Sequence, residues 1–61
     1  MLFVLEIECD NDAFENRQAE VARILIAAAD KIVSSPEDTL NFGLRDVNGN
    51  MVGAAEFFTE K

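Results

Sequence analysis

Residues at the start of the chain fall on two alternating faces, of which one is apolar and the other carries Val4, Glu6 and Glu8. From Leu2 to Cys9 nearly every second residue is apolar, which is typical of a strand with one buried face. Asp10-Asn11-Asp12 ends this pattern, because short polar side chains bind their own backbone and favour turns and helix caps. The side chains expected to face inward are Phe3, Leu5, Ile7 and Cys9.

The apolar spacing becomes helical between Arg17 and Val33. This stretch contains neither Gly nor Pro and is rich in Ala, the strongest helix former. Asn16 is the preferred N-cap, with Asp12 as the alternative, and Pro36 should end the helix by keeping Ser35 extended. The stripe expected to face a sheet is Val21, Ala22, Leu25, Ala28, Ala29 and Ile32, with Ile24 and Ile26 flanking it.

The last third of the chain has the pattern of a β-hairpin. Asn48-Gly49 is a strong hairpin signal, and a two-residue type I′ loop would place Val47 opposite Asn50. That register pairs apolar residues on one face, so the turn and the apolar pattern agree. The expected cross-strand pairs are Leu44 with Gly53, Phe42 with Ala55, and Leu40 with Phe57.

These elements predict an α+β fold in the order β-α-β-β. One helix should pack on a small three-stranded antiparallel sheet of strand order 1-3-2, with order 1-2-3 as the alternative. Since typical domains hold roughly 100 to 150 residues, residues 1–61 should form a single small domain, with 34–39 as its only linker-like segment. The expected core is Phe3, Leu5, Ile7, Val21, Leu25, Ile32, Phe42, Leu44 and Phe57.

The charge balance indicates the class of partner. Five Lys and Arg residues against twelve Asp and Glu residues give a net charge of −7. This charge disfavours nucleic acid and anionic membranes and favours basic proteins. The apolar stretch of residues 1–5 is only five residues long and ends at Glu6, and no basic residue precedes it. We therefore do not expect a signal peptide. No apolar run approaches the length of about 20 residues that spans a membrane, so we expect a soluble protein.

The composition also limits the chemistry. The chain has no His and one Cys, which argues against His-based catalysis, ordinary zinc sites and an internal disulfide. Cys9 belongs to the inward set of the first strand and is expected to be a buried small hydrophobe. Asp10-Asn11-Asp12 is similar to the start of a calcium loop, but Glu15 and Val21 occupy the positions that need Gly and Glu. We expect no catalytic residue, metal or cofactor.

Several short structural motifs follow one another between about Ile7 and Phe57. They are Asp10-Asn11, Ala13-Phe14, Ala19 to Leu25, Leu44-Arg45-Asp46, Asn48-Gly49-Asn50 and Val52-Gly53. In this order they resemble small uncharacterised proteins encoded by bacteriophages and prophages. The resemblance implies a phage context, and hence the cytoplasm of a host cell, but supplies no activity.

Two surfaces are candidates for partner binding. The first is a set of five carboxylates within ten residues, which we call the acidic ridge: Glu6, Glu8, Asp10, Asp12 and Glu15. It is either a solvated surface or a recognition site for a basic protein groove. The second is the outward face of the sheet, where Val4, Val52 and Phe58 are either scattered exposed residues or a contact with a second copy or another protein.

The leading hypothesis is a non-enzymatic, acidic interaction module that binds a basic surface on a host protein, as anti-defence inhibitors such as anti-CRISPR proteins do. The alternative is a structural or accessory homodimer that associates through its outer sheet face. An enzyme would need a bound metal or a cleft, and a chain this short has little room for a cleft beside its core.

Overall fold

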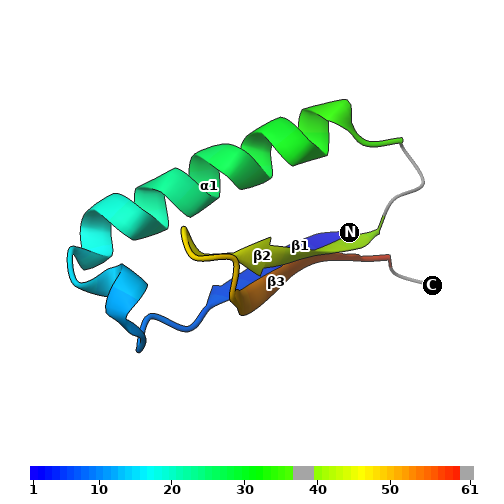
Figure 1. The fold of residues 1–61 in the computed structure, drawn as a ribbon. Helices are drawn as coiled ribbons and strands as arrows, with labels where there is room; N and C mark the ends of the chain where they lie inside the picture. Colours follow the sequence, from blue (N-terminus) through cyan, green and yellow to red (C-terminus); the bar gives the residue numbers. More distant parts are fainter. Residues whose placement is uncertain (37–39, 60–61) are drawn as a thin grey trace.

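The computed structural model describes residues 1–36 and 40–59, so residues 37–39 of the expected linker-like segment lie outside the described residues (Figure 1). Strand β1 is followed by a short 3-10 helix, the long helix α1 and the hairpin β2–β3. The sheet is antiparallel in the order β1-β3-β2, which confirms the predicted β-α-β-β fold. The elements are β1 (Leu2–Ile7), η1 (Asp12–Phe14), α1 (Arg17–Ser34), β2 (Asn41–Arg45) and β3 (Met51–Phe58).

Local side-chain chemistry sets the ends of both helices. The Asn11 Oδ1 atom accepts a hydrogen bond from the Ala13 N–H at 2.9 Å and caps η1. The Asn16 Oδ1 atom accepts from the Ala19 N–H at 3.4 Å, so Asn16 is the N-cap of α1, as predicted. At the other end Ser35 is extended (φ −85°, ψ 154°), as expected for the residue before Pro36.

The hairpin turn differs from the sequence prediction. The Asp46 N–H donates to the Asn50 carbonyl at 2.9 Å and the Gly49 N–H to the Asp46 carbonyl at 3.0 Å, so the loop has three residues, Val47–Gly49. Among the described residues only Gly49 has a positive φ, of 87°, whereas a type I′ turn would also need one at Asn48. The loop is the three-residue type, in which a left-handed residue completes the turn.

A bulge restores the predicted strand register. Leu44 pairs with Gly53, but Arg45 pairs with Met51, which leaves Val52 as an extra residue on β3. The predicted pairs of Leu44 and Phe42 are therefore confirmed, and the Phe57 N–H donates to the Leu40 carbonyl at 2.8 Å. Because an extra residue breaks the alternation of faces, Val52 points toward the helix and not outward as predicted.

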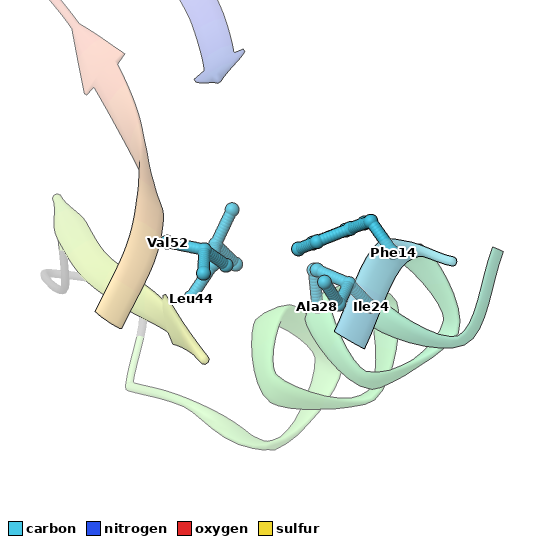
Figure 2. Close-up of a cluster of buried hydrophobic side chains, with 5 residues drawn as sticks. All are labelled: Phe14, Ile24, Ala28, Leu44 and Val52. Atoms are coloured by element: carbon cyan, nitrogen blue, oxygen red, sulfur yellow. The ribbon is translucent and has the colours of Figure 1, made fainter. Parts of the chain in front are cut away.

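The core is small and lies beneath the first half of α1. Figure 2 shows Leu44 and Val52 from the hairpin pointing toward Phe14, Ile24 and Ala28. Half-buried side chains surround this cluster on the sheet, in η1 and on α1. They are Leu5, Ile7, Cys9, Ala13, Val21 and Phe42. Cys9, which the sequence predicted to be buried, packs against the core but is only half-buried.

The predicted orientation of α1 is wrong. Ile24 is 2% exposed and is the centre of the core, whereas Leu25 is 45% exposed and Ile32 is 38% exposed. Phe3, also expected in the core, is 39% exposed. Apolar residues occupy well over half of the helix circumference, so the apolar pattern fits more than one rotation of the helix. Hydrogen bonds between α1 and the hairpin, which are described below, favour the observed rotation of the helix.

Candidate interaction surfaces

The carboxylate of Asp46 organises the hairpin turn. It accepts backbone hydrogen bonds from Asn48 and Asn50 at 2.9 Å each and a side-chain bond from Asn50 at 3.2 Å. The Asn11 Nδ2 atom donates to the same carboxylate at 2.8 Å, across 35 positions of sequence. The Asp10-Asn11 and Asn48-Gly49-Asn50 motifs therefore meet in space at one buried anion.

A second carboxylate, that of Glu20, joins α1 to the same turn. The Arg23 guanidinium donates to both Glu20 oxygens at 2.9 Å, and the Val47 N–H donates to Glu20 Oε2 at 2.8 Å. Arg23 also donates to the Arg45 carbonyl at 3.1 Å. These bonds fix the rotation of α1 over the hairpin. We call the whole set the turn network: Asn11, Glu20, Arg23, Asp46 and Asn50.

The two anions of the turn network are held in the charged form. Burial alone would raise the pKa of Asp46, but the hydrogen bonds from Asn50, Asn11 and Asn48 outweigh it and hold the pKa below its ordinary value of 3.8. The hydrogen bonds from Arg23 hold the pKa of Glu20 below its ordinary value of 4.5, against the effect of burial. Both groups are therefore structural anions at neutral pH. Neither is poised to exchange a proton.

The acidic ridge has the opposite surroundings. All five of its residues are exposed, and no hydrogen bond or ion pair within residues 1–36 and 40–59 reaches their carboxylates. Glu6 and Glu8 line one shallow hollow of the sheet together with Met51 and Ala54. An adjoining hollow at the end of β1 is lined by Cys9, Asp10, Asn11, Asp12, Phe14 and Glu15. The structure thus divides the predicted ridge into a pair on the outer sheet face and a triplet around η1.

The outer sheet face carries only part of the predicted apolar patch. Val52 is 6% exposed and belongs to the core, so its prediction as a surface contact is wrong. Val4 and Phe58 do lie on the outer face, where their cross-strand partners are Glu56 and Leu2. Met51 is 57% exposed beside Glu6 and Glu8, a position that the unpredicted bulge gives it.

Sequence reasoning missed an apolar surface that lies on α1 and on the inner side of the sheet. Phe3 and Phe57 pair across the inner side of the sheet, with ring centroids 4.7 Å apart, yet Phe3 is still 39% exposed. On α1, Ile26 is 71% exposed and Val33 is 84% exposed. Of the three strands α1 lies closest to β2. On β1, Leu5 and Ile7 still pack against the core, whereas Phe3 remains partly exposed. We call this surface the open apolar face: Phe3, Leu25, Ile26, Ile32, Val33 and Phe57.

Another hollow lies between α1 and the hairpin. It has a volume of about 380 Å³ and is lined in part by Ile24, Lys31 and Phe42. The Lys31 ammonium sits 5.4 Å from the centre of the Phe42 ring, a cation–π contact that covers part of this hollow. Among the described residues, no group of three or more His, Cys, Asp or Glu side chains could hold a metal ion.

Within the described part of the chain, no helix has the length and apolar character that crossing a membrane requires. No family model, curated protein or solved structure matches the chain. The function must therefore be inferred from the two carboxylate sets and the apolar surfaces of the chain itself.

Proposed function

We propose that this chain is a non-enzymatic interaction module that binds a basic surface of another protein through the acidic ridge. The observation that carries the proposal is the contrast between two sets of carboxylates. Asp46 and Glu20 are buried and fully hydrogen-bonded, whereas the five ridge carboxylates are exposed without a counter-ion among the described residues.

The charge of the ridge favours a basic partner for two physical reasons. The uncompensated carboxylates give a local negative potential at both parts of the ridge, the pair on the outer sheet face and the triplet around η1. This potential steers a positive surface toward the ridge and raises the association rate. They also repel nucleic acid and anionic membranes directly. The net charge of −7 acts in the same sense over longer distances.

An apolar contact beside the charges would determine how long a complex lasts. Met51 is exposed next to Glu6 and Glu8 in the same hollow, and desolvated apolar contacts mainly slow dissociation. Met is also well suited to irregular partner surfaces, because its side chain is flexible and polarisable. Met51 takes the role that the sequence prediction had given to Val52.

The proposal places this module in the cytoplasm of a bacterial host, as a phage-type inhibitor of a basic host protein such as a component of a defence system. Its support there is the resemblance of the sequence motifs and the acidic surface. The non-enzymatic character is supported by the two buried carboxylates, since hydrogen bonds occupy both and hold them charged.

The test is affinity capture from a bacterial lysate, followed by association kinetics with the purified captured protein. The double variant Asp10→Asn, Asp12→Asn should slow association and flatten its salt dependence, because it removes two ridge charges and keeps the turn-forming shape. The matched control is Asp30→Asn, Glu56→Gln, which removes two exposed charges elsewhere. Equal effects of the two double variants would contradict a role for the ridge.

A second variant tests whether an apolar contact determines the lifetime of the complex independently of its association rate. Met51→Ala should speed dissociation and leave the salt dependence unchanged, because it removes apolar contact and no charge. Phe58→Ala is its control, since Phe58 lies opposite Leu2 at the other end of the sheet. Capture of basic proteins that persists unchanged at high salt would exclude a charge-selected partner.

A further inference from the structure

We infer that the open apolar face is the contact surface for a second copy of this chain. It combines the side and the back of α1 with the exposed aromatic residues on the inner face of the sheet. The helix contributes Leu25, Ile26, Ile32 and Val33, and the sheet contributes Phe3 and Phe57. The sequence-based alternative placed such a contact on the outer sheet face. The structure provides an apolar surface without charged residues away from that outer face.

The size of the molecular surface supports this assignment. The accessible surface of the chain is 4719 Å². A folded monomer of 6.7 kDa is expected to expose about 3900 Å². The excess of about 800 Å² equals the share that one partner contributes to a standard protein interface. This excess is summed over the whole chain, and the exposed apolar side chains of α1 and of the inner sheet contribute to it.

The radius of gyration also indicates that the single chain is less compact than a typical domain of its length. The radius of gyration is 12.3 Å, against about 10.5 Å for a compact domain of this length. Among residues 1–36 and 40–59, six apolar residues form the buried core, whereas eleven large apolar side chains are exposed. A second copy would place several of these side chains in a shared core, which is a common way for very small domains to gain stability.

The distribution of charge selects a second copy over a basic partner. None of the six residues of the open apolar face is charged, so nothing on this face attracts a positive surface. Glu6 alternates with the inward Leu5 and Ile7 and projects from the other side of the sheet. Two copies in symmetric contact would therefore keep their Glu6 and Glu8 carboxylates on opposite outer surfaces.

The rotation of α1 explains why both its side and its back are apolar. Ile24 faces the chain's own sheet, Leu25 lies about 100° around the helix from it, and Val33 lies on the far side. A helix that is apolar on most of its circumference is normally covered on most of it. In a symmetric dimer the partner would cover the side and back of each helix.

The experiment is sedimentation equilibrium of the wild-type chain and of two matched variants over a range of protein concentrations. The wild type should approach a dimer mass. Leu25→Gln should raise the dimer Kd on the order of 100-fold, because each lost apolar contact is worth about tenfold and a symmetric interface contains it twice. Leu2→Gln makes the same change on the outer face, where Leu2 is 59% exposed, and should leave the Kd unchanged.

Val33→Gln covers the case in which Leu25→Gln fails to fold. Val33 is 84% exposed, so its replacement cannot disturb the packing of a single chain, and it should also weaken the dimer. High salt should strengthen the dimer, because it screens the repulsion between two chains of charge −7. A wild-type monomer at all concentrations, a Leu2→Gln effect equal to that of Leu25→Gln, or a dimer that salt weakens would each overturn the inference.

Discussion

The two sides of helix α1 have opposite surroundings. The side toward β2 is tied to the hairpin by the turn network, and no buried polar side-chain atom among the described residues lacks a hydrogen-bond partner. The side toward β1 is apolar and largely exposed at Leu25 and Ile32. The side of α1 toward β2 is covered and hydrogen-bonded within the single chain, whereas the other side remains partly exposed.

The apolar pattern of α1 fits more than one rotation of the helix, and the polar contacts on one side of α1 determine which rotation forms. Apolar contact alone would allow Leu25 or Ile24 to face the sheet, since both lie in a broad apolar surface. The bond from the Val47 N–H to Glu20 and the bond from Arg23 to the Arg45 carbonyl join α1 to the hairpin, so both are satisfied in one rotation of the helix only. Directional polar contacts set the helix rotation, and the apolar residues left over form the open apolar face.

The sharpest test of this comparison replaces two neighbouring residues. Ile24→Ala should destabilise the chain by about 2–5 kcal/mol, which is comparable with the roughly 3–5 kcal/mol that so small a core supplies. This variant should be largely unfolded by circular dichroism. Leu25→Ala should remain folded at high protein concentration, because Leu25 is 45% exposed in the single chain. Equal loss of structure in both variants would show that α1 is rotated differently.

A smaller effect is expected at the contact between β1 and β3. A Cβ atom at Gly53 would overlap the Glu6 carbonyl oxygen, which belongs to the backbone and cannot move aside. Gly53→Ala should cost about 1–3 kcal/mol, as overpacking usually does. Gly43→Ala is the control, because its Cβ would meet only the flexible end of Met51 at 2.7 Å. Thermal unfolding of both variants measures the difference, and equal melting temperatures would contradict the β1–β3 packing.

The hairpin loop gives the next effect. Gly49 has a φ of 87°, a conformation that costs other residues about 1–2 kcal/mol. Gly49→Ala should therefore lower the stability by about that amount, as measured by denaturant unfolding. Asn48→Ala should cost less, because Asn48 has a negative φ. A larger loss at Asn48 than at Gly49 would favour the two-residue loop that the sequence predicted.

The smallest effect is the pH dependence of the turn network. The pKa values of Asp46 and Glu20 are lowered in the folded chain, so these groups contribute stability above their ordinary values of 3.8 and 4.5. That contribution should be lost as the pH falls through those values and below them. Asp46→Asn should make the acid-side slope of the melting temperature shallower. An unchanged slope in Asp46→Asn would contradict the role of this carboxylate.

The parts of the fold that follow from local chemistry were predictable. The alternation of the first strand, the cap at Asn16, the helix end before Pro36 and the pairs of Phe42 and Leu44 all depend on residues close in sequence or on one turn. The strand order also followed from simple topology.

The rotation of α1 and the inward turn of Val52 were not predictable, because each depends on contacts between distant segments. Arg23 reaches the Arg45 carbonyl across 22 positions, and the bulge at Val52 arises where a three-residue loop meets the ladder. For the candidate surfaces, the exposure of the five ridge carboxylates followed from their positions on the strand and in the turn. The open apolar face did not, since its existence depends on the helix rotation.

The central claim is that the β1 side of α1 is apolar because a second copy covers it. The most direct test is the melting temperature of the wild-type chain as a function of protein concentration, at low and at high salt. A dimer requires the melting temperature to rise with concentration, and to rise further at high salt. A melting temperature independent of concentration at both salt levels would contradict the claim.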